Sequence, residues 1–294
     1  MSAIGYENVQ QSSEAFLSPL REHVRQGTPE LLSTFDEYAE EARFGHALLT
    51  ESLQGMPRSA EILEVGAGAL MLSCMLARDG FRVTAVEPVG DGFSHLAKLQ
   101  CVVIDYARAH GAAPDLLRLP GEALAIVDRF DYAFSVNVME HVGDVARVLE
   151  KVYASLKPGG TYRFICPNYA FPYEPHFNIP TLFSRKLTER VMSRRIMTSK
   201  NVVDPAGTWA SLNWITVGQV RSICRERLRT NPAFDRRIFD VYLSRMLSRD
   251  QFTERRGRLF SRVLSGLGRL RLTALAALIP VRWLPVMDCR VVRR

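Results

Sequence analysis

Short apolar runs alternate with helical patterns along most of this chain. The runs are mostly apolar and have the length of buried strands, and they occupy residues 61–65, 82–86, 116–119, 132–137 and 161–166. Helical periodicity fills the intervals up to residue 78, from about residue 93 to 109, and from 145 to 156. Because such strands must be covered on both faces, this alternation predicts an α/β fold with a doubly wound, mostly parallel sheet.

Two further regions flank this alternating part. Before it, apolar side chains recur at helical spacing from about Pro29 to Leu53, which predicts a helical N-terminal preface. After it, the pattern predicts helices over residues 182–200 and 216–229 and a strand over 238–243. The chain is therefore expected to consist of a preface (1–57), a core (58–180) and a largely helical C-terminal part (181–294).

The sequence EILEVGAG at residues 61–68 marks the end of the first strand. Glu64 stands two positions before Gly66, and Ala67 separates Gly66 from Gly68. A strand that turns sharply into a helix beside a ligand needs backbone without a Cβ, which only glycine provides. Since ligands bind at the carboxyl ends of strands in open α/β sheets, this turn predicts a cofactor site.

The nature of the cofactor depends on the residues that follow these glycines. A dinucleotide fingerprint requires GxGxxG, but Met71 occupies the third glycine position, and Leu70 occupies that of the shorter GxGxG variant. Glu87, at the end of the second strand, is placed to accept hydrogen bonds from ribose hydroxyls, a feature that NAD-dependent enzymes share. The residues of this turn therefore argue against NAD as the cofactor, but they do not identify the cofactor that binds instead.

Five motifs in order indicate a different nucleotide: EVGAG at 64–68, AVEP at 85–88, LPGEAL at 119–124, FDYAFSVNVMEHV at 130–142 and LKPGG at 156–160. Over about residues 55–170 they resemble the class I S-adenosylmethionine (SAM)-dependent methyltransferases. The resemblance implies a Rossmann-like sheet of seven strands with SAM as the cofactor. It also implies that WLPVMDCRVV, at 283–292, forms the last, antiparallel strand.

The resemblance assigns roles to individual residues. It implies that the turn formed by Glu64, Gly66, Ala67 and Gly68 shapes the methionine end of the pocket. It further implies that Glu87 binds the ribose, that Glu122 lies near the adenine and that Asn137 lines the methionine portion. Leu70 departs from the family pattern, since many members carry a third glycine there. In LKPGG, Gly159 and Gly160 are expected to end a helix and turn the chain into the next strand, with no chemical role.

The loop CPNYAFPYEPHFNIP, at residues 166–180, is the expected acceptor wall because it leaves the carboxyl edge of the sheet. Methyl transfer needs acceptor, methyl and sulfur in line, and an oxygen or nitrogen acceptor can also need a base. Tyr169, Tyr173 and Glu174 are the expected acceptor contacts, in a loop that its prolines stiffen. His176 is the preferred general base, because imidazole titrates near neutral pH. A histidine that is hydrogen-bonded within a structural loop is the alternative.

Glu140 and His141 form a second candidate pair. In NVMEHV they resemble the segment of ubiquinone-pathway O-methyltransferases in which carboxylates and a histidine can hold a divalent metal, but Asn137 replaces the first carboxylate. Two ligands adjacent in sequence are a poor metal site without others, so no metal is expected. His141 remains the second candidate for a catalytic role, with packing or hydrogen bonding below the acceptor as the alternative.

Charge is distributed unevenly along the chain. Residues 1–180 carry 14 basic and 23 acidic side chains, a net charge of −9, whereas residues 181–294 carry 24 and 8, a net charge of +16. Such a basic part suggests a phosphate-bearing substrate, an anionic membrane surface or nucleic acid, against the alternative of a solvated arginine-rich surface. Nucleic acid is not expected, since no recognised binding module is present.

Residues 251–279 combine apolar side chains at helical spacing with several arginines. A basic amphipathic helix of this kind lies in a membrane interface or packs its apolar face against the protein core. The five cysteines show no ligand or disulfide spacing, and neither a signal peptide nor a spanning apolar run is recognisable. We therefore expect a cytoplasmic protein that touches the membrane only peripherally.

These observations predict a SAM-dependent methyltransferase that acts on a small-molecule or lipid-linked acceptor, with O-methylation preferred over N- or C-methylation. Two alternatives stay open at this point. One is a catalytically silent SAM-binding scaffold or sensor, which product formation with any acceptor would exclude. The other is an NAD-linked oxidoreductase or epimerase, which Leu70 and Met71 disfavour.

Overall fold

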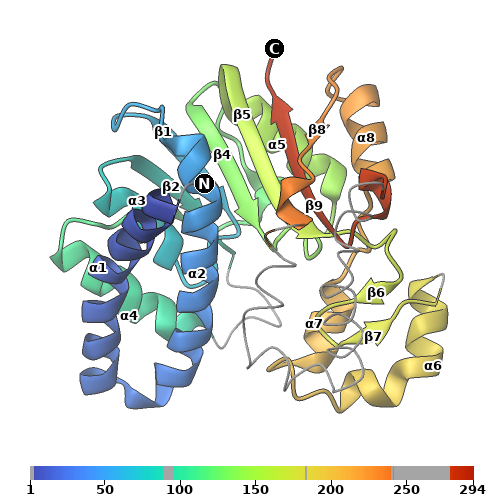
Figure 1. Ribbon diagram of the computed structural model, residues 1–294, viewed down its shortest axis with the longest axis horizontal. Helices are drawn as coiled ribbons and strands as arrows, with labels where there is room; N and C mark the ends of the chain where they lie inside the picture. Colours follow the sequence, from blue (N-terminus) through green and yellow to red (C-terminus); the bar gives the residue numbers. More distant parts are fainter. Residues whose placement is uncertain (1–2, 89–95, 183, 240, 242–278) are drawn as a thin grey trace. The chain divides into compact units, whose positions relative to one another are not determined.

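The computed structural model describes residues 3–88, 96–182, 184–239, 241 and 279–294 (Figure 1). By their contacts the residues form two compact units. The first unit comprises residues 1–136, 151–162 and 293–294, and the second comprises residues 137–150 and 163–292. The predicted division into a preface (1–57), a core (58–180) and a C-terminal part (181–294) does not coincide with these two units, and it stays a prediction.

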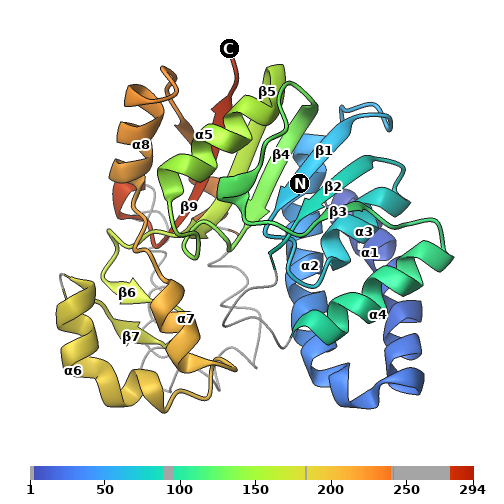
Figure 2. The same ribbon diagram turned by 180° about the vertical axis from the view of Figure 1, so that it is seen from behind.

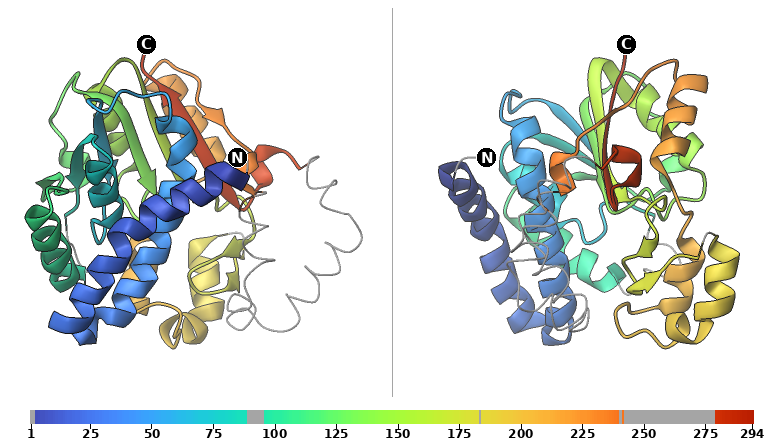
Figure 3. Two further views of the ribbon diagram at one scale, coloured as in Figure 1. Left: turned by 60° about the vertical axis from the view of Figure 1, so that its left-hand side comes forward. Right: turned by 45° about the vertical axis from the view of Figure 1, so that its right-hand side comes forward.

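Two long helices begin the first unit (Figure 3). The short 3-10 turn Pro29–Leu31 joins α1 (Ala3–Gly27) to α2 (Leu32–Leu53). The helices pack through fully buried apolar side chains, among them Leu17, Leu20, Phe35 and Ala39. This confirms the helix predicted from Pro29 to Leu53, and α1 adds a helix that the periodicity did not reveal.

A seven-stranded sheet has the order β3-β2-β1-β4-β5-β9-β8. Its strands are β1 (Glu61–Val65), β2 (Arg82–Val86), β3 (Asp115–Leu117), β4 (Phe130–Val136), β5 (Leu156–Pro167), β8 (Ala233–Phe234) and β9 (Val286–Val292). β1 runs parallel to β2 and β4, and β2 runs parallel to β3, whereas β8 and β9 are antiparallel. β9 is also antiparallel to β5, because Gly159 pairs with Arg293 and Asn168 pairs with Pro285 through backbone hydrogen bonds. The predicted mostly parallel, seven-stranded sheet is confirmed.

Helices connect the parallel strands and cover the sheet. They are α3 (Met71–Arg78), α4 (Leu96–Ala109) and α5 (Val145–Ser155), which Figure 2 labels. The central strands bury both of their faces, as Ile62 and Leu63 on β1 and Phe134 on β4 show by being fully inaccessible. Neighbouring residues of a strand point to opposite faces, so their apolar runs reflect a sheet that is covered on both sides.

The glycines of LKPGG do not end a helix as predicted. α5 ends at Ser155, and the whole motif belongs to the first part of β5. The N–H of Gly159 donates to the carbonyl of Arg293, and Arg293 donates back to Gly160, so both glycines belong to the ladder with the C-terminal strand. A Cβ on Gly160 would lie 2.9 Å from the Lys157 carbonyl oxygen and 3.0 Å from that of Phe130. Glycine is needed here for close backbone packing.

The strand predicted over residues 238–243 is wrong where the structure describes it. Residues 237–239 and 241 are helical, and the edge strand is β8, which pairs Ala233 with Arg290 and Phe234 with Cys289. The side chain of Asp235 accepts a hydrogen bond from the N–H of Arg237 at 2.9 Å. An Asx contact of this kind begins a helical turn, and it ends the extended conformation before Ile238.

Among its described residues, the second unit also contains a two-stranded antiparallel ribbon, β6 (Tyr173–Glu174) and β7 (Ile179–Pro180), and the helices α6, α7 and α8. The helices are α6 (Arg185–Met197), α7 (Pro205–Ser211) and α8 (Val217–Glu226), so both predicted helices of this part exist with shorter bounds. Ser184, Asp204 and Thr216 cap their N-termini with side-chain oxygens. The amphipathic helix predicted over 251–279 lies outside the described residues except for Ile279. No helix in the described part of the chain is long and apolar enough to cross a membrane.

A buried ion pair joins β5 to β9. The guanidinium of Arg163 donates to both carboxylate oxygens of Asp288, at 2.9 and 2.6 Å, and the two residues are only 5% and 1% exposed. A charge taken out of water is tolerated when its partner and its hydrogen bonds are in place. Neither side chain can therefore be removed alone without leaving an unpaired charge in the interior.

We expect Asp288→Asn to lower the free energy of unfolding by about 3–5 kcal/mol, because Arg163 would remain buried without its counterion. Replacing both residues by apolar ones, Arg163→Met with Asp288→Leu, should restore most of that loss. Urea denaturation followed by circular dichroism measures both. As a control, Asp105→Asn breaks an exposed ion pair with Arg108 and should cost less than about 1 kcal/mol. A single variant as stable as the double variant would contradict the expectation.

Candidate functional site

The predicted cofactor turn follows β1 in the first unit. Gly66 has a φ of 79° and Gly68 a φ of 49°, values in the left-handed region that favours glycine. The N–H of Gly66 donates to the Val86 carbonyl at 2.8 Å, and that of Ala67 to the same oxygen at 3.3 Å. Apart from Gly68 itself and its two neighbours in the chain, no described residue has an atom within 4 Å of the place that a Cβ on Gly68 would take. The turn thus leaves one side of the backbone open, as a bound cofactor requires.

Two side chains hold the backbone of Gly68. Glu87, which follows β2, accepts its N–H at 2.8 Å, and Gln100 on α4 donates to its carbonyl at 2.5 Å. Gln100 is fully buried and also accepts a hydrogen bond from Arg118 at 3.2 Å. The carboxylate predicted to bind the ribose therefore touches the glycine turn directly. Sequence reasoning missed the contribution of Gln100, because a glutamine on a helix matches no motif.

Glu64 is enclosed by the fold. It is 4% exposed, and the hydroxyl of Ser73 on α3 donates to its carboxyl group. Burial raises the pKa of Glu64 to about 8, against the opposing effect of the Ser73 hydrogen bond, and the charge of Glu87 adds to the rise. In the structure Glu64 links β1 to α3, and its predicted role at the methionine end of the pocket stays a prediction.

The backbone of Leu70 has a conformation that is typical of glycine. Its φ of 66° and ψ of 0° are left-handed, and it is the N-cap of α3. A leucine rarely adopts this conformation, but the side chain is fully buried in the apolar core. The departure from the family pattern at this position therefore changes the side chain and leaves the shape of the turn as a glycine would make it.

The two remaining predicted cofactor residues lie in different units. Glu122 is half-buried within the 3-10 turn Gly121–Ala123 of the first unit. Asn137 is the first residue of the second unit, and its φ of 55° ends β4 at Val136, one residue earlier than predicted. Its N–H donates to the Ile165 carbonyl at 2.8 Å. The adenine and methionine roles of these residues stay predictions.

We call residues 166–180 the acceptor loop after their predicted role. This loop lies in the second unit and is built around Glu174. Its carboxylate is fully buried and accepts hydrogen bonds from four groups: the Tyr169 hydroxyl at 3.2 Å, Nδ1 of His176 at 2.6 Å, and the N–H groups of His176 and Phe177 at 3.2 and 2.7 Å. Burial, together with the charge of Glu174, raises the pKa of Tyr169 far above its usual range. Glu174 therefore orients His176, and Tyr169 serves as a neutral hydrogen-bond donor.

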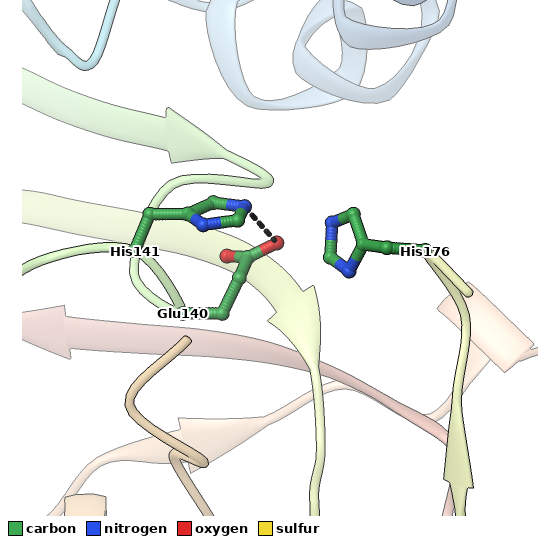
Figure 4. Close-up of side chains that lie close together, drawn as sticks. All are labelled: Glu140, His141 and His176. Atoms are coloured by element: carbon green, nitrogen blue, oxygen red, sulfur yellow. Dashed lines mark ion pairs between the residues drawn. The ribbon is translucent and has the colours of Figure 1, made fainter. Parts of the chain in front are cut away.

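His176 faces a second histidine (Figure 4). The rings of His141 and His176 are 5.1 Å apart and nearly perpendicular, and Glu140 lies beside them. Nδ1 of His141 is 2.7 Å from the hydroxyl of Ser211. Burial lowers the pKa of His141 to about 3, and His176 adds to this shift, so His141 is neutral at ordinary pH. The two predicted catalytic histidines, 35 positions apart in sequence, thus lie side by side.

The same three side chains have the composition of a metal site. One ligand atom from each of Glu140, His141 and His176 lies within 4.8 Å of the other two. Both histidines engage Nδ1 with an oxygen, Glu174 or Ser211, which is how metal-ligating histidines are commonly held. The third ligand that sequence reasoning lacked is therefore His176. The set fits a divalent cation, and the expected absence of a metal stays a prediction.

Tyr173 and an aromatic cluster complete the surroundings. The Tyr173 hydroxyl donates to the side-chain oxygen of Asn178 at 2.6 Å, within the acceptor loop. Tyr169 stacks on Trp214 with ring centroids 5.3 Å apart, and Trp209 packs edge-on against Trp214. Contact of Tyr169, Tyr173 or Glu174 with an acceptor stays a prediction, while their hydrogen bonds show that they shape the loop.

Asn213 is a residue that sequence reasoning missed. Its side-chain amide donates to the carbonyls of Met139 and Val142, at 2.8 and 2.9 Å, and its backbone N–H donates to that of Glu140 at 2.8 Å. Three hydrogen bonds thus fix the turn that carries Glu140 and His141. No local motif could reveal this contact, because about 70 residues separate the partners.

Comparison with known proteins places the chain in a family. The model of a methyltransferase domain family matches residues 35–198, which is more than half of the chain. The uncharacterized protein Rv1509 of Mycobacterium tuberculosis strain H37Rv is 42% identical over 281 residues, covering 96% of this chain and 95% of that protein. A ubiquinone biosynthesis O-methyltransferase of Paramagnetospirillum magneticum is 36% identical over 121 residues, covering 41% of this chain and 45% of that protein.

A solved structure shares the fold. Phosphoethanolamine N-methyltransferase 2 of Haemonchus contortus, in complex with SAM, matches 84% of this chain and 51% of that chain, with a TM-score of 0.50 and 13% identity. At this identity the similarity concerns the fold alone. The family match, with the five ordered motifs and the open glycine turn beside Glu87, shows that this chain belongs to the class I SAM-dependent methyltransferases, which use SAM as cofactor.

Proposed function

We propose that this protein transfers a methyl group from SAM to an oxygen atom of a small-molecule or lipid-linked acceptor, with His176 as the general base. The observation that carries the proposal is the hydrogen bond of 2.6 Å between Nδ1 of His176 and the buried carboxylate of Glu174. A carboxylate in this position holds the imidazole in one orientation and stabilises it when it becomes charged. A histidine that is hydrogen-bonded within a structural loop would make the same contact, and the turnover of the His176→Gln variant separates the two roles.

The proton transfer follows from this arrangement. With Nδ1 engaged by Glu174, Nε2 of His176 accepts the proton of the acceptor hydroxyl as the oxygen–methyl bond forms, and the sulfur–methyl bond of SAM breaks. Glu174 stabilises the resulting imidazolium. Neutral His141, whose pKa burial lowers to about 3, adds no positive charge beside it. The relative named as a ubiquinone biosynthesis O-methyltransferase supports an oxygen acceptor, since it is 36% identical over the 121 matched residues.

The basic charge of the C-terminal part supports an anionic acceptor. Residues 181–294 carry 24 basic and 8 acidic side chains. Such an excess raises the local concentration of phosphate-bearing molecules and of molecules held at an anionic membrane. A phosphate-bearing or lipid-linked acceptor is thus preferred over a neutral one. A catalytically silent SAM-binding protein is the competing interpretation, and the Glu174–His176 pair argues against it.

A second candidate mechanism rests on the cluster of Glu140, His141 and His176, whose ligand atoms lie within 4.8 Å of one another. A divalent cation held there would lower the pKa of an acceptor hydroxyl and remove the need for a protein base. The same side chain of His176 cannot hold a cation through Nε2 and accept a proton on that atom. The two mechanisms therefore exclude each other in one catalytic cycle.

The cofactor assignment predicts that Glu87→Ala weakens SAM binding about tenfold or more, because hydrogen bonds to a charged acceptor contribute about 1.5–3 kcal/mol. Calorimetry with SAM, its demethylated product and NAD measures this. Glu87→Gln keeps an acceptor for the Gly68 N–H and separates loss of the ligand contact from loss of the turn. Asp105→Ala removes an exposed carboxylate of α4 and should leave the affinity unchanged. Tighter binding of NAD than of SAM would overturn the assignment.

The base proposal predicts that His176→Gln lowers kcat about 100-fold or more with little change in KM. Transfer of labelled methyl groups to phenolic, carboxylate and phospholipid acceptors supplies the assay. The wild-type rate should fall at acidic pH as the base becomes protonated, and this dependence should vanish in the variant. Exposed His110 provides the control, since His110→Gln should keep both rate and pH profile. Absence of product from every acceptor would favour the silent SAM-binding protein.

Removal of metal separates the two mechanisms. Under the base proposal, dialysis against EDTA leaves the rate unchanged, because proton transfer to His176 needs no cation. A rate lost on dialysis and restored by Mg²⁺ or Zn²⁺ would establish the cation mechanism instead. Calorimetric titration of each cation into the wild type and into His176→Gln provides an independent readout, since only a site that uses His176 loses affinity in the variant.

A further inference from the structure

Helix α6 of the second unit exposes a face that combines cations with apolar side chains. Lys186, Arg190 and Arg194 are exposed, while Leu187 and Val191 expose 43% and 58% of their surface. At about 100° per residue, these five positions lie within about 140° of the helix circumference. We call them the cationic-apolar face. The opposite side of the helix buries Thr188 and Ile196 against the rest of the unit.

Exposed apolar side chains gather on this helix and the segment after it. Nine large apolar side chains of the described residues are exposed, and four of them lie in this short stretch: Leu187, Val191, Met197 and Val203. Single exposed apolar residues are ordinary on a soluble protein, whereas a group of them indicates an interaction surface. Residues 184–203 also carry six basic side chains and one acidic side chain. The partner of this surface is therefore expected to be anionic.

The cations of the face do not serve the fold. Arg185 donates to the carbonyls of Leu212 and Trp209, and so holds α6 to α7. In contrast, neither Lys186, Arg190 nor Arg194 forms an ion pair or side-chain hydrogen bond within the part of the chain that the structure describes. Their charge is thus available to an external partner, and their substitution should not disturb the unit.

We propose that the cationic-apolar face of α6 docks on an anionic lipid surface. Lysine and arginine heads lie at the level of lipid phosphates, while leucine and valine side chains enter the interface below them. The helix has 13 residues and is about 20 Å long, enough to lie along a membrane plane. A nucleic acid would satisfy the cations and leave the apolar side chains in water, so the lipid surface accounts for more of the face.

The acceptor loop is attached to this helix. Arg195 donates to the carbonyl of Asn178 at 3.0 Å, and Asn178 accepts the Tyr173 hydroxyl through its side chain at 2.6 Å. His176 lies between these two loop residues. Docking of α6 would therefore hold the loop that carries His176 close to the lipid headgroups. The docking itself does not depend on the proposed function, and only the inference that the acceptor is membrane-held rests on it.

Sedimentation of the full chain with vesicles tests the proposal. The wild type should bind vesicles of phosphatidylcholine mixed with phosphatidylglycerol, and should not bind phosphatidylcholine alone. Arg190→Gln with Arg194→Gln should lower the binding constant about 30-fold, since each cation near an anionic surface contributes roughly a fivefold factor. Leu187→Ser with Val191→Ser should lower it about tenfold by removing apolar contact.

Two arginines at the C-terminal end of α8 control for net charge. Arg225→Gln with Arg227→Gln removes two exposed cations from the other end of the same unit (Figures 1 and 2), of which Arg225 donates to Asn231 and Arg227 pairs with Glu150. This variant should bind anionic vesicles nearly as the wild type does. An equal loss in both arginine pairs, no binding of the wild type, or unchanged binding of both α6 variants would overturn the proposal. Circular dichroism of each variant verifies the fold, and SAM calorimetry shows separately whether the cofactor site is intact.

Discussion

The path of the loop that is predicted to contact the acceptor, residues 166–180, depends on how one buried charge is satisfied, that of Glu174. A carboxylate without access to water must find donors within the protein, and here the donors are Tyr169, His176 and Phe177. Two of the four hydrogen bonds come from backbone N–H groups, so the path of the loop is fixed as well as its side chains. The placement of His176 follows from this requirement, and Tyr169 extends it to the aromatic cluster by stacking on Trp214.

The sheet and the glycine turn could be predicted because their determinants are local. Only Ala67 separates Gly66 from Gly68 in sequence, and the strands β1, β2 and β4 are each encoded by one short, mostly apolar run. Only a few residues need to be read together to recognise such a unit. Glu87 is the partial exception. Its position at the end of the second strand and the family pattern both predicted a ribose contact, whereas its bond to Gly68 emerged from the structure.

The surroundings of the histidines could be predicted only in part. His141 and His176 were recognised because histidine is uncommon and suited to proton transfer. Their supports, Ser211 and Asn213, come from a region with no motif, and a serine or asparagine in a loop has many ordinary roles. The prediction of a strand at Ile238 was wrong for a related reason. The position of an edge strand depends on which residues pair with the neighbouring strand. Asp235 and β9 determine where that strand ends, and neither effect is contained in the local pattern.

Leu70 has a consequence for how relatives of this protein are recognised. The turn requires a left-handed backbone at this position, and a motif written in glycines records only the residue that adopts it most easily. Here a leucine adopts the left-handed backbone, which is unfavourable for it, and its side chain is fully buried in the apolar core. A search that insists on the third glycine would pass over any chain that has made the same exchange. Relatives are better sought by the backbone geometry of the turn together with the apolar side chain that packs behind it. A change from leucine to glycine would keep this backbone geometry but would leave a cavity in the core.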